Sequence, residues 1–380
     1  MYKNIFYEII DGWYLGMTKI DDLRLIVLES ARDLGELVDN HLKVLRNSET
    51  SYIVPIKESR FANGEGKLEI CESVREKDVY ILSDVGNYSI TRKYRGIDHI
   101  LGPDEHFADV KRVIAASANH ARRVSVIMPL LYESRQHKRK GRESLDCAMG
   151  LQELEYYRIR SFVTFDAHDP SVANAVPRMA FDNFYATSQI LETMYEKDID
   201  DVSNLLVLAP DMGAVERARY YADIIGCDVG CFNKRRDYSC VVDGKNPIIA
   251  HDYLGRDMTG KDIIIVDDMI ASGGSVFDVA ERAKKMGANK IFVCATFALF
   301  TEGIEAFTRA YEKGIINRVY STNLTYVPDY IKALPWYVDV DSSRKIAEIV
   351  NDLNVGCSLE PLHHDGNETY QKLLKIKSEK

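Results

Sequence analysis

The sequence predicts an α/β protein whose mainly parallel sheets are covered by helices. Two observations predict this class. Short apolar runs of four to five residues recur along the chain, and segments with a helical period of about 3.6 residues lie between them. Most residues in these runs are aliphatic or β-branched, as expected for strands that are buried on both faces.

The strand candidates are distributed over most of the chain. In order they lie at 25–28, 79–82, 124–128, 162–165, 205–208, 263–266 and 291–295. Segment 275–286 illustrates the helices between them, because Val276, Val279 and Ala283 fall on one face of a helix. A second helical pattern covers 343–353.

The alternation of strands and helices runs twice, which predicts two similar domains. A chain of 380 residues is long enough for two domains that each bury a core. The boundary is expected near residue 180, with an N-terminal domain at 1–180 and a C-terminal domain at 181–380. Residues 1–24 and 355–380 lack the alternation and are expected to be appendages.

The composition argues against several classes of protein. The net charge of -9 argues against a sequence-independent nucleic-acid binder, because such proteins need a basic face. No apolar run approaches the roughly 20 residues that span a bilayer, so no membrane association is expected. The first residues include acids and aromatics where a signal peptide would be basic and then apolar. The seven cysteines lack the spacing of a zinc site, which favours reduced thiols in a cytoplasmic protein.

The most informative segment is 263–275, where an apolar strand ends in Asp267 and Asp268 and a turn of small residues leads into a helix. Glycines let the backbone approach a phosphate, and a helix N-terminus supplies free N–H groups. The expected phosphate ligands are Ser272, Gly273, Gly274 and Ser275. The two carboxylates repel phosphate, so they suit a sugar diol or a hydrated Mg²⁺ instead.

An alternative interpretation of the same segment is a Gly-Gly turn with solvated acids and a serine that caps the helix. The order strand, turn, helix favours the anion site over this alternative. The segment resembles the ribose-phosphate-binding loop of the type I phosphoribosyltransferase fold. That resemblance implies two phosphoribosyltransferase-type domains, each a mainly parallel sheet flanked by helices. The family usually has a third acid where this chain has Ala271.

Four further segments resemble one family, ribose-phosphate pyrophosphokinase. In the first, 60–65, the resemblance implies that Phe61, Asn63 and Glu65 line the adenine site of ATP across a subunit interface. An aromatic ring can stack on a purine, and an acid can accept a hydrogen bond from its amino group. Asn63 stands where the family usually has Asp. Taken alone, the segment is typical of a polar turn.

The second segment is 128–140, in which Arg135 and Gln136 match the family and His137 replaces an acid. The resemblance implies that these three residues bind ATP. The guanidinium of arginine suits phosphate oxygens, and the basic residues at 138–140 add diffuse attraction. Taken alone, such a basic run is as often a solvated face.

The third and fourth segments add an expected metal site and the expected catalytic groups. His168 follows a strand, in a position that the family uses to face the ATP-bound metal and triphosphate, although a lone histidine is more often structural. Asp211, in a strand–turn–helix pattern, matches an acid that the family places near the metal. Lys234 and Arg236 resemble the start of the family's mobile catalytic loop. The resemblance thus implies His168, Lys234 and Arg236 as catalytic, and His168 and Asp211 as metal ligands.

The resemblance extends from about residue 24 to residue 353. It implies transfer of a pyrophosphoryl group from Mg²⁺-bound ATP to ribose 5-phosphate, giving AMP and phosphoribosyl pyrophosphate, in a homo-oligomer that is commonly a hexamer. Two alternatives stay open: a phosphoribosyltransferase, which consumes that product, and a non-catalytic paralogue that regulates an active synthetase. Asn63, His137 and Ala271 favour the paralogue. The retained charges at the expected site favour the enzyme.

Overall fold

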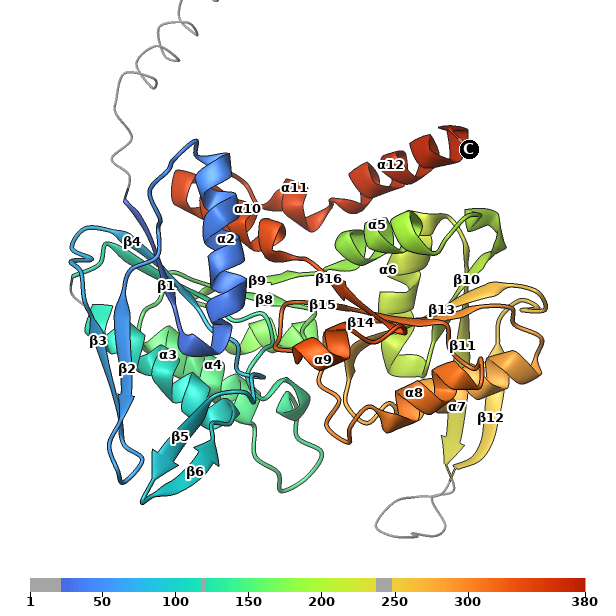
Figure 1. The fold of residues 1–380 in the computed structure, drawn as a ribbon, viewed down its shortest axis with the longest axis horizontal. Coiled ribbons are helices and arrows are strands. Elements are labelled where there is room, and N and C mark those ends of the chain that lie inside the picture. The colour runs from blue at the N-terminus through green and yellow to red at the C-terminus, as the bar shows by residue number, and fades with distance from the viewer. Residues whose placement is uncertain (1–21, 118–119, 237–247, 380) are drawn as a thin grey trace, which may run out of the picture.

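The computed structural model of the protein describes residues 22–117, 120–236 and 248–379, without the side chains of 233–236, 248–251 and 373–379. Two large sheets lie side by side, and helices cover both faces of each sheet (Figure 1). The first sheet has the strand order β1-β4-β7-β8-β9, and all its described strand pairs are parallel. The second has the order β12-β11-β10-β13-β14-β15-β16 and is parallel except for the edge strand β12.

The strand candidates before residue 180 all coincide with strands of the first sheet. These strands are β1 (Leu23–Val27), β4 (Asp78–Leu82), β7 (Arg123–Ile127) and β8 (Ser161–Phe165); the fifth strand, β9 (Ala180–Phe184), was not among the candidates. The helices of this half are α2 (Arg32–Leu45), α3 (Pro103–Ser117) and α4 (Asp146–Tyr156), with 3-10 turns at Glu29–Ala31, Ser134–Gln136 and Pro170–Ala175. Two antiparallel hairpins are added, β2 (Ile56–Arg60) with β3 (Gly66–Ile70), and β5 (Thr91–Tyr94) with β6 (Ile97–Ile100).

The later strand candidates are also confirmed, in the second sheet. Its strands are β10 (Leu205–Ala209), β11 (Asp228–Arg236), β12 (Ile248–Leu254), β13 (Asp262–Ile270), β14 (Ile291–Ala298), β15 (Arg318–Thr322) and β16 (Tyr337–Val340). Its helices are α5 (Thr187–Lys197), α6 (Val215–Ile225), α7 (Gly274–Lys285), α8 (Glu305–Glu312) and α9 (Asp329–Lys332), with 3-10 turns at Val202–Asn204 and Met212–Ala214. The helix expected at 275–286 is α7.

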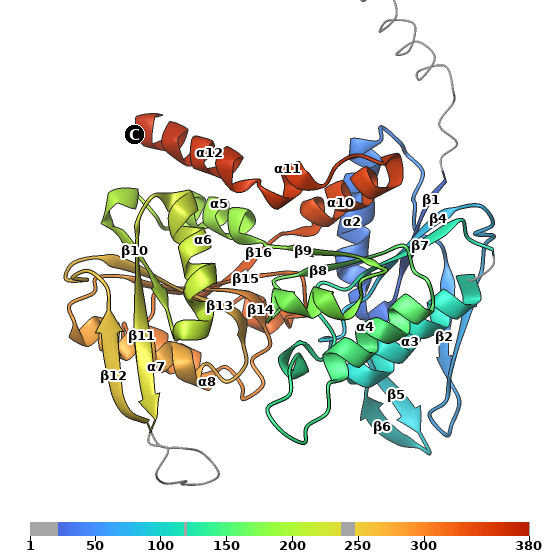
Figure 2. The same cartoon turned by 180° about the vertical axis from the view of Figure 1, so that it is seen from behind.

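The central strands of the second sheet bury side chains on both faces. Along β10, Leu206 and Leu208 pack into the cluster that contains Phe307, whereas Leu205 and Val207 pack into the cluster on the opposite face. This alternation follows from the two-residue period of a strand. Burying each such side chain contributes about 1.5–3 kcal/mol, and this explains why these strands are apolar throughout. Helices α5 and α6 cover one face, and α7 and α8 cover the other (Figure 2).

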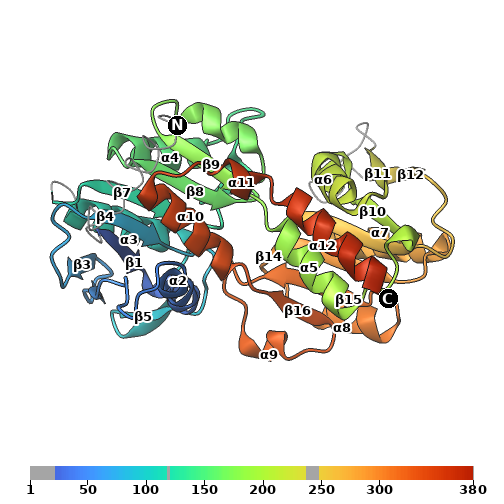
Figure 3. The same cartoon turned by 90° about the horizontal axis from the view of Figure 1, so that it is seen from above.

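The chain returns to the first half after it completes the second sheet. Helix α10 (Ser343–Val355), expected at 343–353, follows β16 and packs against α2 (Figure 3). Ile346 and Val350 of α10 belong to the same buried cluster as Leu25 of β1. The core of the first sheet is therefore completed by residues from the end of the chain.

The expectation that 355–380 is an appendage was wrong. Helices α11 (Glu360–His363) and α12 (Gly366–Glu379) follow α10, and α12 packs against α5 and α6. Thr369 Oγ1 and Lys372 Nζ both donate to Glu192 Oε1 of α5, at 3.1 and 2.7 Å. These contacts are largely polar, so the segment lacks the apolar period that predicted the other helices.

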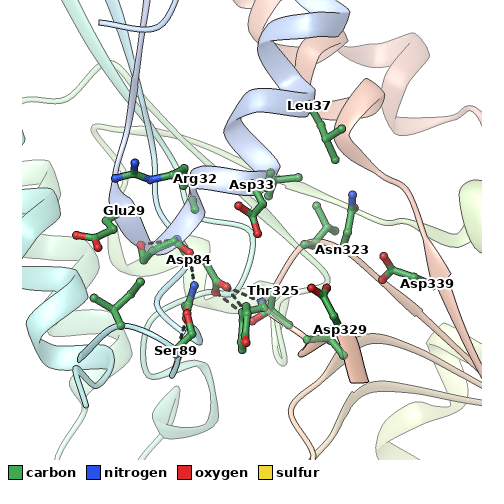
Figure 4. A pocket seen from close by; sticks show the side chains of 18 of the residues that line it. Glu29, Arg32, Asp33, Leu37, Asp84, Ser89, Asn323, Thr325, Asp329 and Asp339 are labelled. Carbon is green, nitrogen blue, oxygen red and sulfur yellow. Dashed lines mark hydrogen bonds between the residues drawn. The ribbon is translucent and has the colours of Figure 1, made fainter. Parts of the chain in front are cut away.

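Asp84, in the loop after β4, links the two halves. Its carboxylate accepts hydrogen bonds from the Tyr326 N–H at 2.7 Å and from the Thr325 hydroxyl at 3.0 Å. Burial raises the pKa of Asp84 to about 6. A cavity of about 310 Å³ lies beside it, and Glu29 and Asp33 are among its lining residues (Figure 4). In the part of the chain that the structure describes, no helix is long and apolar enough to cross a membrane.

Candidate active site

The predicted phosphate loop has the expected strand–turn–helix geometry. Strand β13 ends at Ile270 and α7 begins at Gly274, so the turn presents the N-terminus of a helix of 12 residues. Gly273 has φ of 77°, and a Cβ atom there would lie 2.5 Å from the Phe307 ring, so only glycine fits. The Gly274 N–H donates to Ser272 Oγ at 3.4 Å. The turn containing Ser272, Gly273, Gly274 and Ser275 is thus held close to its own helix.

Asp267 and Asp268 form a carboxylate pair at the end of the apolar part of β13, in which Asp268 is buried and Asp267 is partly buried. The Asp268 N–H donates to Asp267 Oδ1 at 3.0 Å. Burial and the neighbouring charge of Asp268 raise the pKa of Asp267. Burial also disfavours ionised Asp268, but the hydrogen bond from His168 and the charge of Arg217 outweigh it and lower the pKa of Asp268. The pair therefore favours a ligand that supplies positive charge or hydroxyl donors.

His168 reaches this pair from the first half of the molecule. It follows β8, and its Nδ1 lies 2.7 Å from Asp268 Oδ2. The hydrogen bond to Asp268 raises the pKa of His168, although burial opposes this effect. The side chain is 41% exposed, so the rest of the ring remains accessible to a ligand. The contact joins residues 100 positions apart and places His168 beside the acid pair.

A second buried contact between the halves was missed by the sequence analysis. Arg217 of α6 donates to both carboxylate oxygens of Asp166, from Nε at 2.9 and 3.1 Å and from Nη2 at 2.7 Å. The Thr296 hydroxyl of β14 donates to Asp166 Oδ2 at 2.6 Å. Asp166 has a left-handed φ of 42°, which is unusual for a residue other than glycine. Asp166 and Arg217 stand close to His168 and Asp211 in the sequence, and that proximity was the available signal.

Asp211 lies in the loop after β10, which is adjacent and parallel to β13. Leu208 pairs with Ile265 at the end of the β10–β13 ladder, so Asp211, just after β10, and Asp267, further along β13, lie at the same edge of the sheet. The Asp211 carboxylate accepts a hydrogen bond from the Gly213 N–H at 2.9 Å and is exposed. Among the residues that the structure describes, no three His, Cys, Asp or Glu side chains are grouped to hold a metal ion.

Two of the three residues predicted to bind ATP in the segment after β7, Arg135 and His137, lie next to residues of the site. Arg135 Nε donates to Met269 Sδ of β13 at 3.1 Å. The His137 ring lies 5.3 Å from the His168 ring, and its Nε2 lies 3.2 Å from Asp169 Oδ2. The Gln136 amide instead donates to the Ser144 carbonyl at 2.8 Å, within its own loop.

The predicted adenine-binding turn between β2 and β3 lies away from these residues. The β2–β3 hairpin is on the side of the first half that faces away from α7 (Figures 1 and 2). Phe61 is 56% exposed. Asn63 Nδ2 donates to Glu65 Oε2 at 2.9 Å, so these two side chains contact each other. Within one chain, the structure does not bring this turn to the phosphate loop.

Lys234 and Arg236 lie on β11, and their side chains are outside the described residues. The pairing of β10 with β11 ends at Ala209 and Cys231. Beyond that point β11 pairs with β12 alone, with Lys234 opposite His251. The β11–β12 ribbon therefore extends past the edge of the sheet at which Asp211 and the acid pair lie.

Two family models match consecutive parts of the chain. The N-terminal domain of ribose phosphate pyrophosphokinase matches residues 23–157, and the phosphoribosyl transferase domain matches residues 180–315. A ribose-phosphate pyrophosphokinase of Thermococcus kodakarensis is 31% identical over 215 residues, covering 55% of this chain and 72% of that protein. The chain belongs to the ribose-phosphate pyrophosphokinase family. The resemblance inferred from the sequence is thereby confirmed.

Other members of the ribose-phosphate pyrophosphokinase family match most of the chain. The Ureaplasma parvum protein is 29% identical over 308 residues, which is 80% of this chain and 84% of that protein. The crystal structure of phosphoribosylpyrophosphate synthetase from Mycobacterium smegmatis has a TM-score of 0.72 at 21% identity, covering 88% of this chain and 99% of the other. The expected fold class, with phosphoribosyltransferase-type domains, is confirmed as well.

Proposed function

We propose that the protein is a ribose-phosphate diphosphokinase, which converts ATP and ribose 5-phosphate to AMP and 5-phosphoribosyl 1-pyrophosphate. The observation that carries the proposal is the acid pair Asp267 and Asp268 beside the Gly273 turn, with His168 Nδ1 at 2.7 Å from Asp268 Oδ2. This arrangement offers an anion cradle, two acids and a histidine at one edge of a sheet, where ligands of α/β proteins bind.

The sugar phosphate occupies the turn in this proposal. Its 5-phosphate accepts hydrogen bonds from the backbone of Gly273 and Gly274 and from the hydroxyls of Ser272 and Ser275. Asp267 and Asp268 accept hydrogen bonds from the ribose hydroxyls. Repulsion between the acids and the phosphate then fixes the direction of the sugar, with the phosphate at the helix N-terminus and the ring at the acids.

The donor groups at this edge fit Mg²⁺, because Mg²⁺ prefers oxygen ligands and needs only one or two carboxylates when substrate phosphates supply the rest. Asp267 and Asp268 would hold the ion, with Asp211 at the same edge. When bound, Mg²⁺ neutralises negative charge on the phosphates. Asp268 holds Nδ1 of His168, so the remaining ring nitrogen would be free to bind the metal beside the triphosphate, with the carboxylate fixing the direction of the ring.

The reaction itself is an in-line displacement. The C1 hydroxyl oxygen of the sugar forms a bond to the β-phosphorus of ATP, the bond between that phosphorus and the oxygen bridging to the α-phosphorus breaks, and the hydroxyl proton is released. Positioning and charge neutralisation carry the catalysis. Arg135, Gln136 and His137 orient the triphosphate. Lys234 and Arg236 stabilise the charge on the transferred group, and closure of their segment excludes water.

The adenine base needs a surface that one chain does not bring to this site. We propose that Phe61, Asn63 and Glu65 reach the base from a neighbouring copy, in a cytoplasmic homo-oligomer, with a hexamer as the expected assembly. The exposed position of Phe61 and the location of its hairpin on the side away from α7 support this arrangement (Figure 3).

The test is AMP formation by the purified protein from ATP and Mg²⁺, with and without ribose 5-phosphate. AMP that depends on the sugar, in equal amount to phosphoribosyl pyrophosphate, is the expected result, and chelation by EDTA should abolish it. Pyrophosphate release that requires a nitrogenous base would instead indicate a transferase. A folded protein that binds ATP without forming AMP would indicate the regulatory paralogue, which the acid-to-alanine change at Ala271 favours.

The acid pair is tested by Asp268→Asn, which removes the charge that holds His168. We expect at least a hundredfold loss of kcat, about 3 kcal/mol of transition-state stabilisation. Glu281→Gln, on the following helix, is the matched control and should retain full activity. A D268N enzyme within tenfold of the wild type would contradict the role of the pair.

A further inference from the structure

We propose that the β5–β6 hairpin is a positioning element for the turn at 61–65 and that Tyr94 is its positioning residue. The inference rests on the proposed function, because it concerns the turn that is to bind the adenine base. Tyr94 does not contact the nucleotide in this proposal. It acts through the turn, by holding the backbone that carries Phe61 and Glu65.

The tips of the two hairpins contact each other directly. The Arg95 N–H donates to the Ala62 carbonyl at 2.8 Å. Arg95 and Gly96 have φ of 50° and 82°, the pattern of a tight two-residue hairpin turn, and Tyr94 pairs with Ile97 across it. The Arg95 N–H therefore has a fixed direction and holds the middle of the turn at 61–65.

The Tyr94 ring packs against the same turn at Gly64. A Cβ atom placed on Gly64 would lie 3.5 Å from this ring, which is van der Waals contact, and Gly64 itself has φ of 96°. The ring stacks on His99, with 4.6 Å between the ring centroids. The Tyr94 hydroxyl is buried beside Arg60, and we assign the support of the turn to the ring, which lies next to Gly64.

The β5–β6 hairpin is anchored to the body of the protein at its other end. His99 Nε2 lies 2.7 Å from Glu105 Oε1 of α3, and Glu105 Oε2 accepts the Gly102 N–H at 2.8 Å. Arg92 pairs with Glu29, which lines the cavity of Figure 4. The hairpin thus links α3 and the 3-10 turn after β1 to the turn at 61–65.

The hairpin contributes little to the core, so its role is local. Every residue of β6 is exposed, and Ile97 is 72% exposed. An isolated two-stranded hairpin is marginally stable, so it persists only through the anchors described above. The turn at 61–65 is itself closed by only a few hydrogen bonds, including Phe61 N–H to the Glu65 carbonyl at 2.8 Å. Ordering such a turn before the ligand arrives lowers the entropy lost on binding.

The experiment compares Tyr94→Ala, Tyr94→Phe and the exposed-site control Ile97→Ser in steady-state kinetics. We expect Y94A to raise the KM for ATP about tenfold, with kcat and the KM for ribose 5-phosphate within about twofold, because only the adenine turn loses its order. Y94F retains the ring and should behave as wild type, as should I97S.

An unchanged KM for ATP in Y94A, or a Y94F enzyme as impaired as Y94A, would overturn the proposal, and so would equal losses in all three kinetic constants. If Y94A does not fold, His99→Ala removes the supporting stack at a half-exposed site and should change the KM for ATP in the same direction. If the wild type forms no AMP, the proposed function fails, and calorimetric binding of ATP to wild type and Y94A tests the hairpin independently.

Discussion

Arg217→Met is the sharpest perturbation of the contact between the two halves of the protein. In the wild type, three N–O distances of 2.7–3.1 Å join Arg217 to Asp166, and the two side chains are 13% and 3% exposed. Methionine fills similar volume but leaves the Asp166 carboxylate with only the Thr296 hydroxyl, at 2.6 Å. The variant therefore isolates a buried charge without opening a large cavity.

Removing one partner of a buried ion pair typically costs about 3–5 kcal/mol, because the remaining charge is uncompensated. Thr296 still donates to Asp166, so we expect the free energy of unfolding to fall by about 3 kcal/mol at pH 7.5. Burial already raises the pKa of Asp166 in the wild type, and loss of the Arg217 charge raises it further. A folded-state pKa above the unfolded one means stability that is present at low pH and lost as the pH rises. The deficit of the variant should therefore shrink as the pH falls from 7.5 to 5.

The assay is urea-induced unfolding at both pH values. Arg219→Met, at an exposed position of the same helix, is the matched control and should change the stability by less than about 0.5 kcal/mol. Adding Asp166→Asn to R217M should recover part of the loss at pH 7.5, because the charge that lost its partner is gone. The reasoning would be refuted if the free energies of unfolding of R217M and R219M differed by less than about 1 kcal/mol, or if the loss in R217M did not depend on pH.

Two further variants test the phosphate loop and a buried acid. Gly273→Ala should lower the free energy of unfolding by about 1–3 kcal/mol, because its Cβ would lie 2.5 Å from the Phe307 ring. Gly274→Ala is the control and should be nearly neutral, because its Cβ would have no contact closer than 3.6 Å. Equal shifts in Tm for the two variants would contradict the clash. Burial raises the pKa of Glu58 to about 7, so the wild type should lose stability as pH rises towards 8. Glu58→Gln keeps an acceptor for the Glu29 N–H. In chemical denaturation its free energy of unfolding should exceed that of the wild type by about 1–2 kcal/mol at pH 8, and the two should be equal at pH 4. Glu69→Gln, on the exposed side of the same hairpin, should show no such gain.

Local patterns in the sequence were sufficient to predict the central strands and the glycine turn between β13 and α7. Strands such as β8 and β13 are apolar because both of their faces are buried, and that burial is visible in a short window of residues. The Gly-Gly pair after Asp268 likewise predicts a turn, since only glycine adopts the φ of 77° at Gly273 without strain.

The less regular elements were not predicted because their local patterns are ambiguous. Strand β9 is only partly buried, and β15 and β16 contain polar residues within short apolar segments. Helix α12 holds α5 through hydrogen bonds to Glu192, and a hydrogen-bonded face has no apolar period to detect.

The sequence by itself determined the α/β class, the order of the central strands along the chain and the turn that leads from β13 into α7. Only the tertiary structure decided which charges meet: His168 joins Asp268 across 100 positions, and Thr296 joins Asp166 across 130. It also decided that the turn at 61–65, where we predicted the adenine site, lies away from this site. Strand and turn preferences depend on neighbours within a few residues. The burial and pairing of a charge depend on which distant segments the packed core brings together.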